Sequence, residues 1–113
     1  MLEIAVKAAD SKRAEDIIAL EVKEISLLAD YFLICSANTD RQISAIVDAI
    51  IEEEQKAKVQ IRRVEGKDGG KWILIDLGDV IVHVFSTSER AFYNLEKLWS
   101  DAPLVAISNW IDE

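Results

Sequence analysis

The sequence is poor in the residues that build disulfide frameworks, linkers and metal sites. It holds one cysteine, one histidine, one proline and four glycines among 113 residues. A single cysteine excludes an intramolecular disulfide and a cysteine-based zinc site, and we expect Cys35 to be a small buried side chain within a strand. No low-complexity segment or linker interrupts the chain, which favours one domain over residues 1–113.

Long apolar runs are also absent. Half of the residues are apolar, but they fall in short clusters, and none approaches the roughly 18 residues that a bilayer-spanning helix needs. Met1 leads into Glu3 and Lys7 without a signal-peptide pattern. We therefore expect a soluble, cytoplasmic, globular protein that makes no membrane contact.

Basic residues are scarce relative to acidic ones. The chain has 13 lysines and arginines against 21 acidic residues, for a formal charge of −8. This sign disfavours the phosphate backbone as the main contact surface, so we expect no direct nucleic-acid specificity. An acidic domain is attracted to basic proteins, of which ribosomal proteins are the largest cellular reservoir. The charge therefore permits a basic protein partner without identifying one.

The first third of the chain predicts a helix and two strands. Apolar residues recur every three to four positions from Leu2 to Ala9, which is typical of a short amphipathic helix. The run from Ile17 to Val22 can be a strand or a continuation of that helix, and we predict a strand. The run from Tyr31 to Ser36 is rich in aromatic and branched residues, which favours a mostly buried strand.

A capping box predicts where a second helix begins. Thr39 precedes Gln42 by three residues, as in many helix starts. The apolar stripe of this helix consists of Ile43, Ile46, Val47, Ile50 and Ile51. The acidic run Glu52 to Glu54 is expected at the solvated end and not at a metal site. The alternation from Val59 to Glu65 then predicts a half-exposed strand.

The stretch from Trp72 to Phe85 contains two strand-like runs joined at Gly78 and Asp79. A glycine at the first central position is typical of a type II′ hairpin, which pairs residue 76 with 81, 74 with 83 and 72 with 85. One face is then entirely aliphatic and is expected in the core: Ile73, Ile75, Leu77, Val80, Val82 and Val84. The other face carries Trp72, Leu74, Asp76, Ile81, His83 and Phe85. This mixed face is either covered by a helix or partly open to solvent.

A third helix is predicted after the hairpin. Ser86 and Glu89 form another capping box. The apolar stripe consists of Phe92, Leu95, Leu98 and Trp99, with Tyr93 off the stripe. Pro103 ends the element, and residues 104–111 form an apolar tail expected to pack back on the domain. Together these elements predict an α/β fold with a mixed five-stranded sheet flanked by helices.

Residues for catalysis are not arranged in a recognisable pattern. A nucleotidyltransferase needs two closely spaced carboxylates that hold a metal, whereas Asp76 and Asp79 straddle the hairpin turn. His83, the sole histidine, lies in mid-strand, where a structural or interface role is the simpler interpretation. We expect no catalytic residue, no metal and no cofactor. The alternative is a nucleotide-handling enzyme that uses Asp30, Asp76 and Asp79.

Three segments of the chain resemble the ribosomal silencing factor family, or Iojap-like proteins. They are residues 14–17, residues 29–36 leading into 40–42, and residues 72–85 followed by 90–99 and Pro103. The tract from Asp76 to Phe85, followed by the Arg-x-Phe-Tyr-x-Leu-Glu-x-Leu-Trp sequence, is long and ordered, so the resemblance is specific. One departure is Ala37, where members of the family tend to carry a glycine. This difference bears on the conformation of the turn after Ser36 and leaves the resemblance to the family unchanged.

The resemblance implies a nucleotidyltransferase-like shape without catalytic residues, often as a homodimer. It implies a partner, the large-subunit ribosomal protein numbered fourteen, which lies on the face that meets the small subunit. Occupying that protein would sterically block association of the subunits and repress translation on starvation. Such a protein is not an enzyme, because it makes and breaks no bond.

A partner-binding surface is expected on the exposed parts of the mixed hairpin face and the third helix. The predicted contact residues are Trp72, Leu77, Asp79, His83, Tyr93 and Pro103. Aromatic side chains bury a large area at small entropic cost, and acidic ones complement a basic partner. Each residue also has a purely structural interpretation, as core, turn or helix end. A dimeric scaffold for another basic protein would differ only in its partner.

Overall fold

A mixed five-stranded sheet lies at the centre of the protein, whose structure, a computed structural model, describes residues 1–111. The strands are β1 (Glu15–Glu21), β2 (Tyr31–Ala37), β3 (Arg63–Glu65), β4 (Trp72–Asp76) and β5 (Val80–Ser86). Their spatial order is β1-β2-β5-β4-β3. Strands β2 and β5 are parallel, and the other neighbours are antiparallel. The predicted mixed α/β fold is confirmed.

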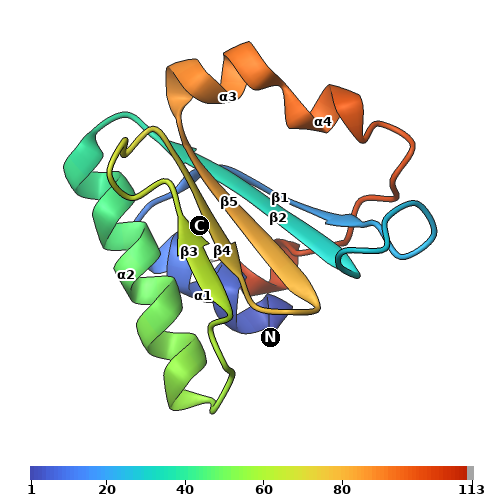
Figure 1. Cartoon of the computed structure of the whole chain (residues 1–113), viewed down its shortest axis with the longest axis horizontal. Helices are drawn as coiled ribbons and strands as arrows, with labels where there is room; N and C mark the ends of the chain where they lie inside the picture. Colours follow the sequence, from blue (N-terminus) through green and yellow to red (C-terminus); the bar gives the residue numbers. More distant parts are fainter. Residues whose placement is uncertain (112–113) are drawn as a thin grey trace.

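Helices lie on both faces of the sheet (Figure 1). One face is covered by α1 (Leu2–Ser11) and α2 (Asp40–Lys56), and the other by α3 (Thr87–Tyr93) and α4 (Leu95–Leu98). The C-terminal segment returns to the sheet, with Leu104 bridged to Leu20 of β1, before a short 3-10 turn at Ser108–Trp110. The predicted return of the tail is confirmed.

Within residues 1–111, no helix combines the length and apolarity needed to cross a membrane.

The hairpin of β4 and β5 has the predicted register. Residue 76 pairs with 81, 74 with 83 and 72 with 85. Gly78 has a φ of +98°, which glycine adopts at little cost, and the Leu77 backbone N–H donates to the Val80 carbonyl at 2.9 Å. The predicted aliphatic face is buried against α1 and α2, in a cluster that includes Ile73, Ile75, Leu77, Val80, Val82 and Val84.

The strand predicted from Val59 to Glu65 is correct only in its last three residues, which form β3. Val59 and Ile61 nevertheless pack against the core as partly buried side chains. The alternation of apolar and polar residues reports which side chains are buried, and it does not require a partner strand. Residues 59–62 therefore show the pattern of a strand without forming one.

Glu54 is fully buried, so its predicted place at the solvated end of α2 is wrong. It follows Val47 by seven residues and Ile50 by four, and both spacings put it on the apolar stripe. Neither carboxylate oxygen has a hydrogen-bond partner among the described residues. Burial raises the pKa of Glu54 to about 7, opposed in part by the positive charge of the chain's amino terminus.

We expect Glu54→Gln to be more stable than wild type at pH 8 and to lose most of that advantage at pH 5. The ordinary carboxyl pKa is 4.5 and the pKa in the fold is about 7. The stability contribution of this group is therefore fully present below pH 4.5 and is lost as the pH rises to about 7. Urea unfolding at both pH values should give a difference of roughly 1–3 kcal/mol at pH 8. A difference that does not change with pH would contradict the assignment.

Candidate partner-binding surface

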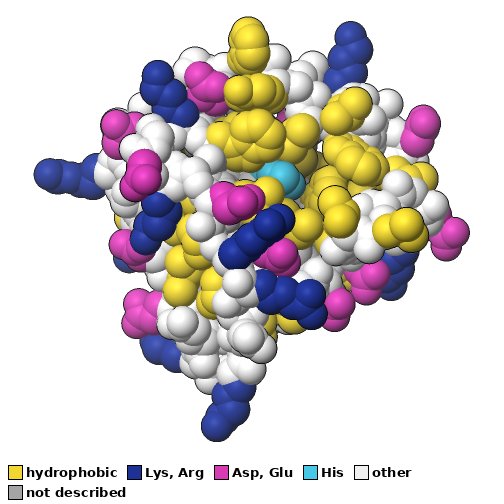
Figure 2. Space-filling view, in the orientation of Figure 1, with side chains coloured by type: hydrophobic (Ala, Val, Ile, Leu, Met, Phe, Trp, Pro, Cys, Tyr) yellow, Lys and Arg dark blue, Asp and Glu magenta, His cyan; other side chains and the backbone are white. Residues whose placement is uncertain are grey.

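The second face of the sheet is less completely covered than the first. Helix α2 has 17 residues, whereas α3 has 7 and α4 has 4. Trp72 and Leu74 on this face are only partly buried. Hydrophobic side chains gather on this face around the histidine and extend across the molecule in Figure 2. The mixed hairpin face is thus partly covered and partly open.

The third predicted helix is in fact two helices. It breaks at Asn94, which has φ 49° and ψ 57° in the left-handed region. Asparagine is one of the few residues that adopt this conformation readily. The predicted start is confirmed, because the Ser86 hydroxyl accepts a hydrogen bond from the Glu89 N–H at 3.3 Å.

The break changes which side chains face the sheet. Leu95 and Trp99 pack against the buried cluster of this face, as predicted. Phe92 and Leu98 are 80% and 73% exposed, so their predicted place on a packed stripe is wrong. Tyr93, predicted off the stripe, packs on Trp72 and Phe85 of the sheet and remains partly exposed. Phe92, Tyr93 and Leu98 therefore all present apolar area to solvent.

Aromatic rings form a connected cluster across this face. The Trp72 ring lies 4.9 Å from Phe85 and 4.6 Å from Tyr93, measured between centroids. Phe32 contacts both His83 and Trp99 edge to face, each at 5.1 Å. Edge-to-face and offset contacts at such distances are favourable. The partly exposed rings of this face therefore pack on a layer of buried aromatic side chains.

His83 lies at the centre of this cluster and is buried. Its Nδ1 accepts a hydrogen bond from Nε1 of Trp72 at 3.2 Å. Burial lowers the pKa of His83 to about 4, so the ring is neutral at physiological pH. With Nδ1 an acceptor, the neutral ring carries its proton on Nε2. His83 therefore orients the Trp72 indole without adding charge to the surface.

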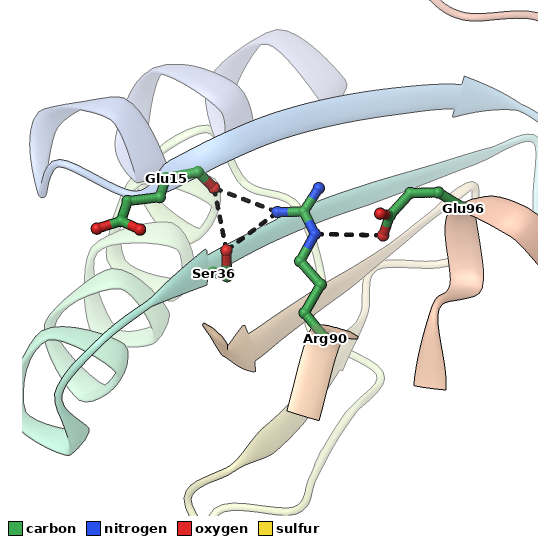
Figure 3. A network of polar contacts seen from close by, with 4 residues as sticks. All are labelled: Glu15, Ser36, Arg90 and Glu96. Atoms are coloured by element: carbon green, nitrogen blue, oxygen red, sulfur yellow. Dashed lines mark hydrogen bonds and ion pairs between the residues drawn. The ribbon is translucent and has the colours of Figure 1, made fainter. Parts of the chain in front are cut away.

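Arg90 fastens the two short helices to the sheet (Figure 3). Its Nε donates to Glu96 at 3.2 Å, and its Nη1 donates to the Ser36 hydroxyl at 3.1 Å and to the Glu15 carbonyl at 3.3 Å. These contacts join α3 to the start of α4 and to the adjoining ends of β1 and β2. The guanidinium thereby positions Tyr93, three residues along the chain. Sequence periodicity gave no signal for this role.

The other predicted contact residues divide into two groups. Trp72 and Tyr93 touch each other and are partly exposed, and Trp72 contacts the buried His83. Asp79 and Pro103 are exposed at the opposite end of the strands. The Asp79 carbonyl accepts from the N–H groups at the start of β2, and the Pro103 carbonyl accepts from the last residue of β1 at 2.9 Å.

Leu77 does not belong to this surface. It is 3% exposed and lies in the core between the sheet and α1 and α2. The two-residue period of the hairpin places its side chain on the aliphatic face, opposite Trp72. Its predicted place among exposed contact residues is therefore wrong.

Asp76 and Asp79, which were considered for catalysis, have structural positions at the hairpin turn. Oδ1 of Asp76 accepts from the Gly78 N–H at 2.9 Å, and Asp79 is at the hairpin tip. No group of three or more acidic, histidine or cysteine residues that could hold a metal occurs within residues 1–111. Burial raises the pKa of the Cys35 thiol to about 12, against a smaller opposing effect of Arg90, so this thiol is not a nucleophile at neutral pH.

Known proteins are similar to this chain along nearly its whole length. A family model described as "Ribosomal silencing factor during starvation" matches residues 1–113. The chain belongs to the ribosomal silencing factor family. The chain is similar to the ribosomal silencing factor RsfS of Bacillus subtilis, with 55% identity over 104 residues, 92% of this chain and 88% of that protein. The RsfS of Halalkalibacterium halodurans is 50% identical over 111 residues, 98% of this chain and 95% of that protein.

A solved structure supports the same fold. A crystal structure of a Bacillus halodurans protein has a TM-score of 0.83 at 50% identity, covering 93% of this chain and 95% of that one. The ribosomal silencing factors are regulatory, non-enzymatic proteins, which bears out the expectation of a non-enzyme. The alternative of a nucleotide-handling enzyme has no support.

We expect Arg90→Ala to lower the free energy of unfolding by about 2–4 kcal/mol, because it removes three hydrogen bonds of a buried guanidinium at once, one of them fully buried and two partly buried. Arg90→Lys should recover little, since an ammonium cannot reproduce the planar guanidinium. Lys97→Ala, at an exposed position of α4, is the control and should change stability by less than about 0.5 kcal/mol. Urea unfolding followed by tryptophan fluorescence measures all three. Equal stabilities of Arg90→Ala and the control would refute the role.

Proposed function

We propose that this protein binds the large ribosomal subunit through its ribosomal protein fourteen and sterically prevents association with the small subunit. Repression of translation on starvation would follow from this occlusion. Membership of the ribosomal silencing factor family supports the ribosomal target. The observation that carries the proposal is the partly exposed pair Trp72 and Tyr93 on the incompletely covered sheet face. We also propose that the chain acts as a single cytoplasmic domain without a cofactor.

The aromatic pair is suited to anchor a protein partner. Its rings are already in contact, and the Trp72 indole is held by His83, so little side-chain entropy is lost on binding. Aromatic residues of this kind are enriched among those that dominate interface energies. Acidic side chains elsewhere on the surface complement a basic partner.

The size of the protein is sufficient for steric occlusion. The described body measures 34 × 34 × 30 Å. A body about that thick, held on the face of one ribosomal subunit, separates the opposing surfaces by far more than any hydrogen bond or apolar contact can span. The mechanism therefore needs affinity and position only.

We expect Tyr93→Ala and Trp72→Ala to weaken binding to purified large subunits by about tenfold or more each. Tyr93→Ala is the cleaner test, because Tyr93 is 47% exposed and contributes less to the core. Gln55→Ala, exposed on α2 at the other face of the sheet, is the control. Sedimentation with large subunits measures binding, and circular dichroism checks folding. Full affinity in a folded Trp72→Ala or Tyr93→Ala protein would place the surface elsewhere.

We further propose that the protein forms a homodimer through the outer surface of α3 and α4. Both sheet edges are poor sites for pairing with a second copy. Residues 103–105 already bond to β1 at one edge, and β3 at the other edge has three residues, two of them charged and exposed. Phe92 and Leu98, by contrast, are large apolar side chains in solvent.

We expect the double variant Phe92→Ser, Leu98→Ser to shift the protein from dimer towards monomer in light scattering at micromolar concentration. The two side chains are 80% and 73% exposed, so their loss should not unfold the chain. Arg63→Ala on β3 tests the sheet edge and should leave the dimer intact. A wild-type protein that is monomeric throughout would exclude the dimer itself.

A further inference from the structure

The loop between β1 and β2 presents a group of large apolar side chains to solvent. Leu27 is 105% exposed, Leu28 is 77% exposed, and Ile25 is also exposed. Burying a large apolar side chain is favourable, so three exposed apolar side chains within four positions need an explanation. None of the functions considered above uses them.

The loop is ordered by its own hydrogen bonds. Its ends are tied by the Val22 N–H, which donates to the Asp30 carbonyl at 2.8 Å. The Ser26 N–H donates to the Val22 carbonyl at 2.8 Å, and the Ser26 hydroxyl accepts from the Leu28 N–H at 3.1 Å. Val22 and Ala29 are buried on either side. The leucines are therefore held outward by a preorganised turn, which reduces the entropy lost when a partner covers them.

The loop lies at the end of the sheet that carries Asp79 and Pro103. The Asp30 N–H, at the end of the loop, donates to the Asp79 carbonyl at 2.8 Å. The Glu21 N–H, just before the loop, donates to the Pro103 carbonyl at 2.9 Å. Two predicted contact residues are thus direct neighbours of the loop, on the β1 and β5 sides.

The loop and the aromatic pair are two ends of one surface. Trp72 and Asp79 are separated by one hairpin strand of about 20 Å. Half-buried Leu74 and Trp99 lie on the face between them, packed on the same cluster as Val22 and Ala29. Hydrophobic side chains are correspondingly spread over this face from α3 at the top to the right-hand side of Figure 2. A contact of this length fits a standard interface of about 800 Å² per partner.

The charges beside the loop define the partner's chemistry. Exposed Glu24 and Asp79, with half-exposed Glu21 and Asp30, flank the leucines. Lys23 is the one cation in this stretch, and it lies 5.1 Å above the Tyr31 ring and 4.0 Å from Glu21. Acidic side chains therefore surround the exposed Leu27 and Leu28, an arrangement that fits a basic protein surface with an apolar depression.

We propose that Leu27 and Leu28 form a second apolar contact with the same basic ribosomal protein that the aromatic pair binds. This inference rests on the proposed function and adds to it a binding element from a different part of the chain. The partner would offer an apolar depression bordered by lysine or arginine, placed about 20 Å from the site of Trp72 and Tyr93.

The test measures binding of immobilised ribosomal protein fourteen, and of purified large subunits, by biolayer interferometry. Leu27→Ser with Leu28→Ser should raise the Kd by about tenfold or more. Leu27→Met with Leu28→Met keeps the apolar surface and should stay within about twofold of wild type. Because both leucines are in solvent, the melting temperatures of all three proteins should agree.

The outcomes separate the two proposals. If wild type binds and the double serine variant binds equally well, the inference about the loop is wrong and the proposed function stands. If wild type binds neither the ribosomal protein nor the subunit, the proposed function fails and the inference with it. If the serine variant instead loses only self-association in light scattering, the loop contacts a second copy and the inference is overturned.

Discussion

The fold depends on the parallel pairing of β2 with β5, whose residues from Phe32 to Ala37 and from Val80 to Phe85 are buried on both faces. A strand pair buried on both faces requires cover above and below. Helices α1 and α2 supply it on one side with long apolar stripes. On the other side the cover comes from the two short helices α3 and α4, while the returning tail packs with Ile107 and Trp110 on the α1 side, so some large side chains of the second face remain partly in water. The surface available for binding follows from this unequal cover.

The proposed binding face has a closely packed centre that carries little charge. A neutral histidine holds the Trp72 indole, and a buried guanidinium at Arg90 fixes the helices that carry Tyr93. Acidic residues such as Asp79 lie around this centre and not within it. In the proposed function, apolar contact at the centre would supply affinity, while the surrounding acidic side chains would favour basic neighbours and disfavour nucleic acid.

Local patterns predicted the parts of the fold that local interactions determine. The register of the hairpin follows from Gly78 and a two-residue period, and the helix starts follow from short capping patterns. The helical period of α2 indicates that Glu54 is buried, but its place in an acidic run favours an exposed position, and the prediction followed the acidic run. The break at Asn94 and the contacts of Arg90 depend on segments distant in the chain, so no local pattern revealed them. Residues 23–28 lack any period and gave no signal of a surface role.

The covered edges of the sheet bear on how such an apolar surface can be tolerated. Exposed backbone N–H and carbonyl groups at a strand edge are what template fibrillar aggregation. Here the tail occupies the β1 edge, and the β3 edge is short and bears Arg63 and Glu65. Exposed apolar side chains of two molecules can therefore come into contact without the sheets pairing edge to edge. An exposed apolar surface is therefore compatible here with a sheet whose edges do not recruit a further strand.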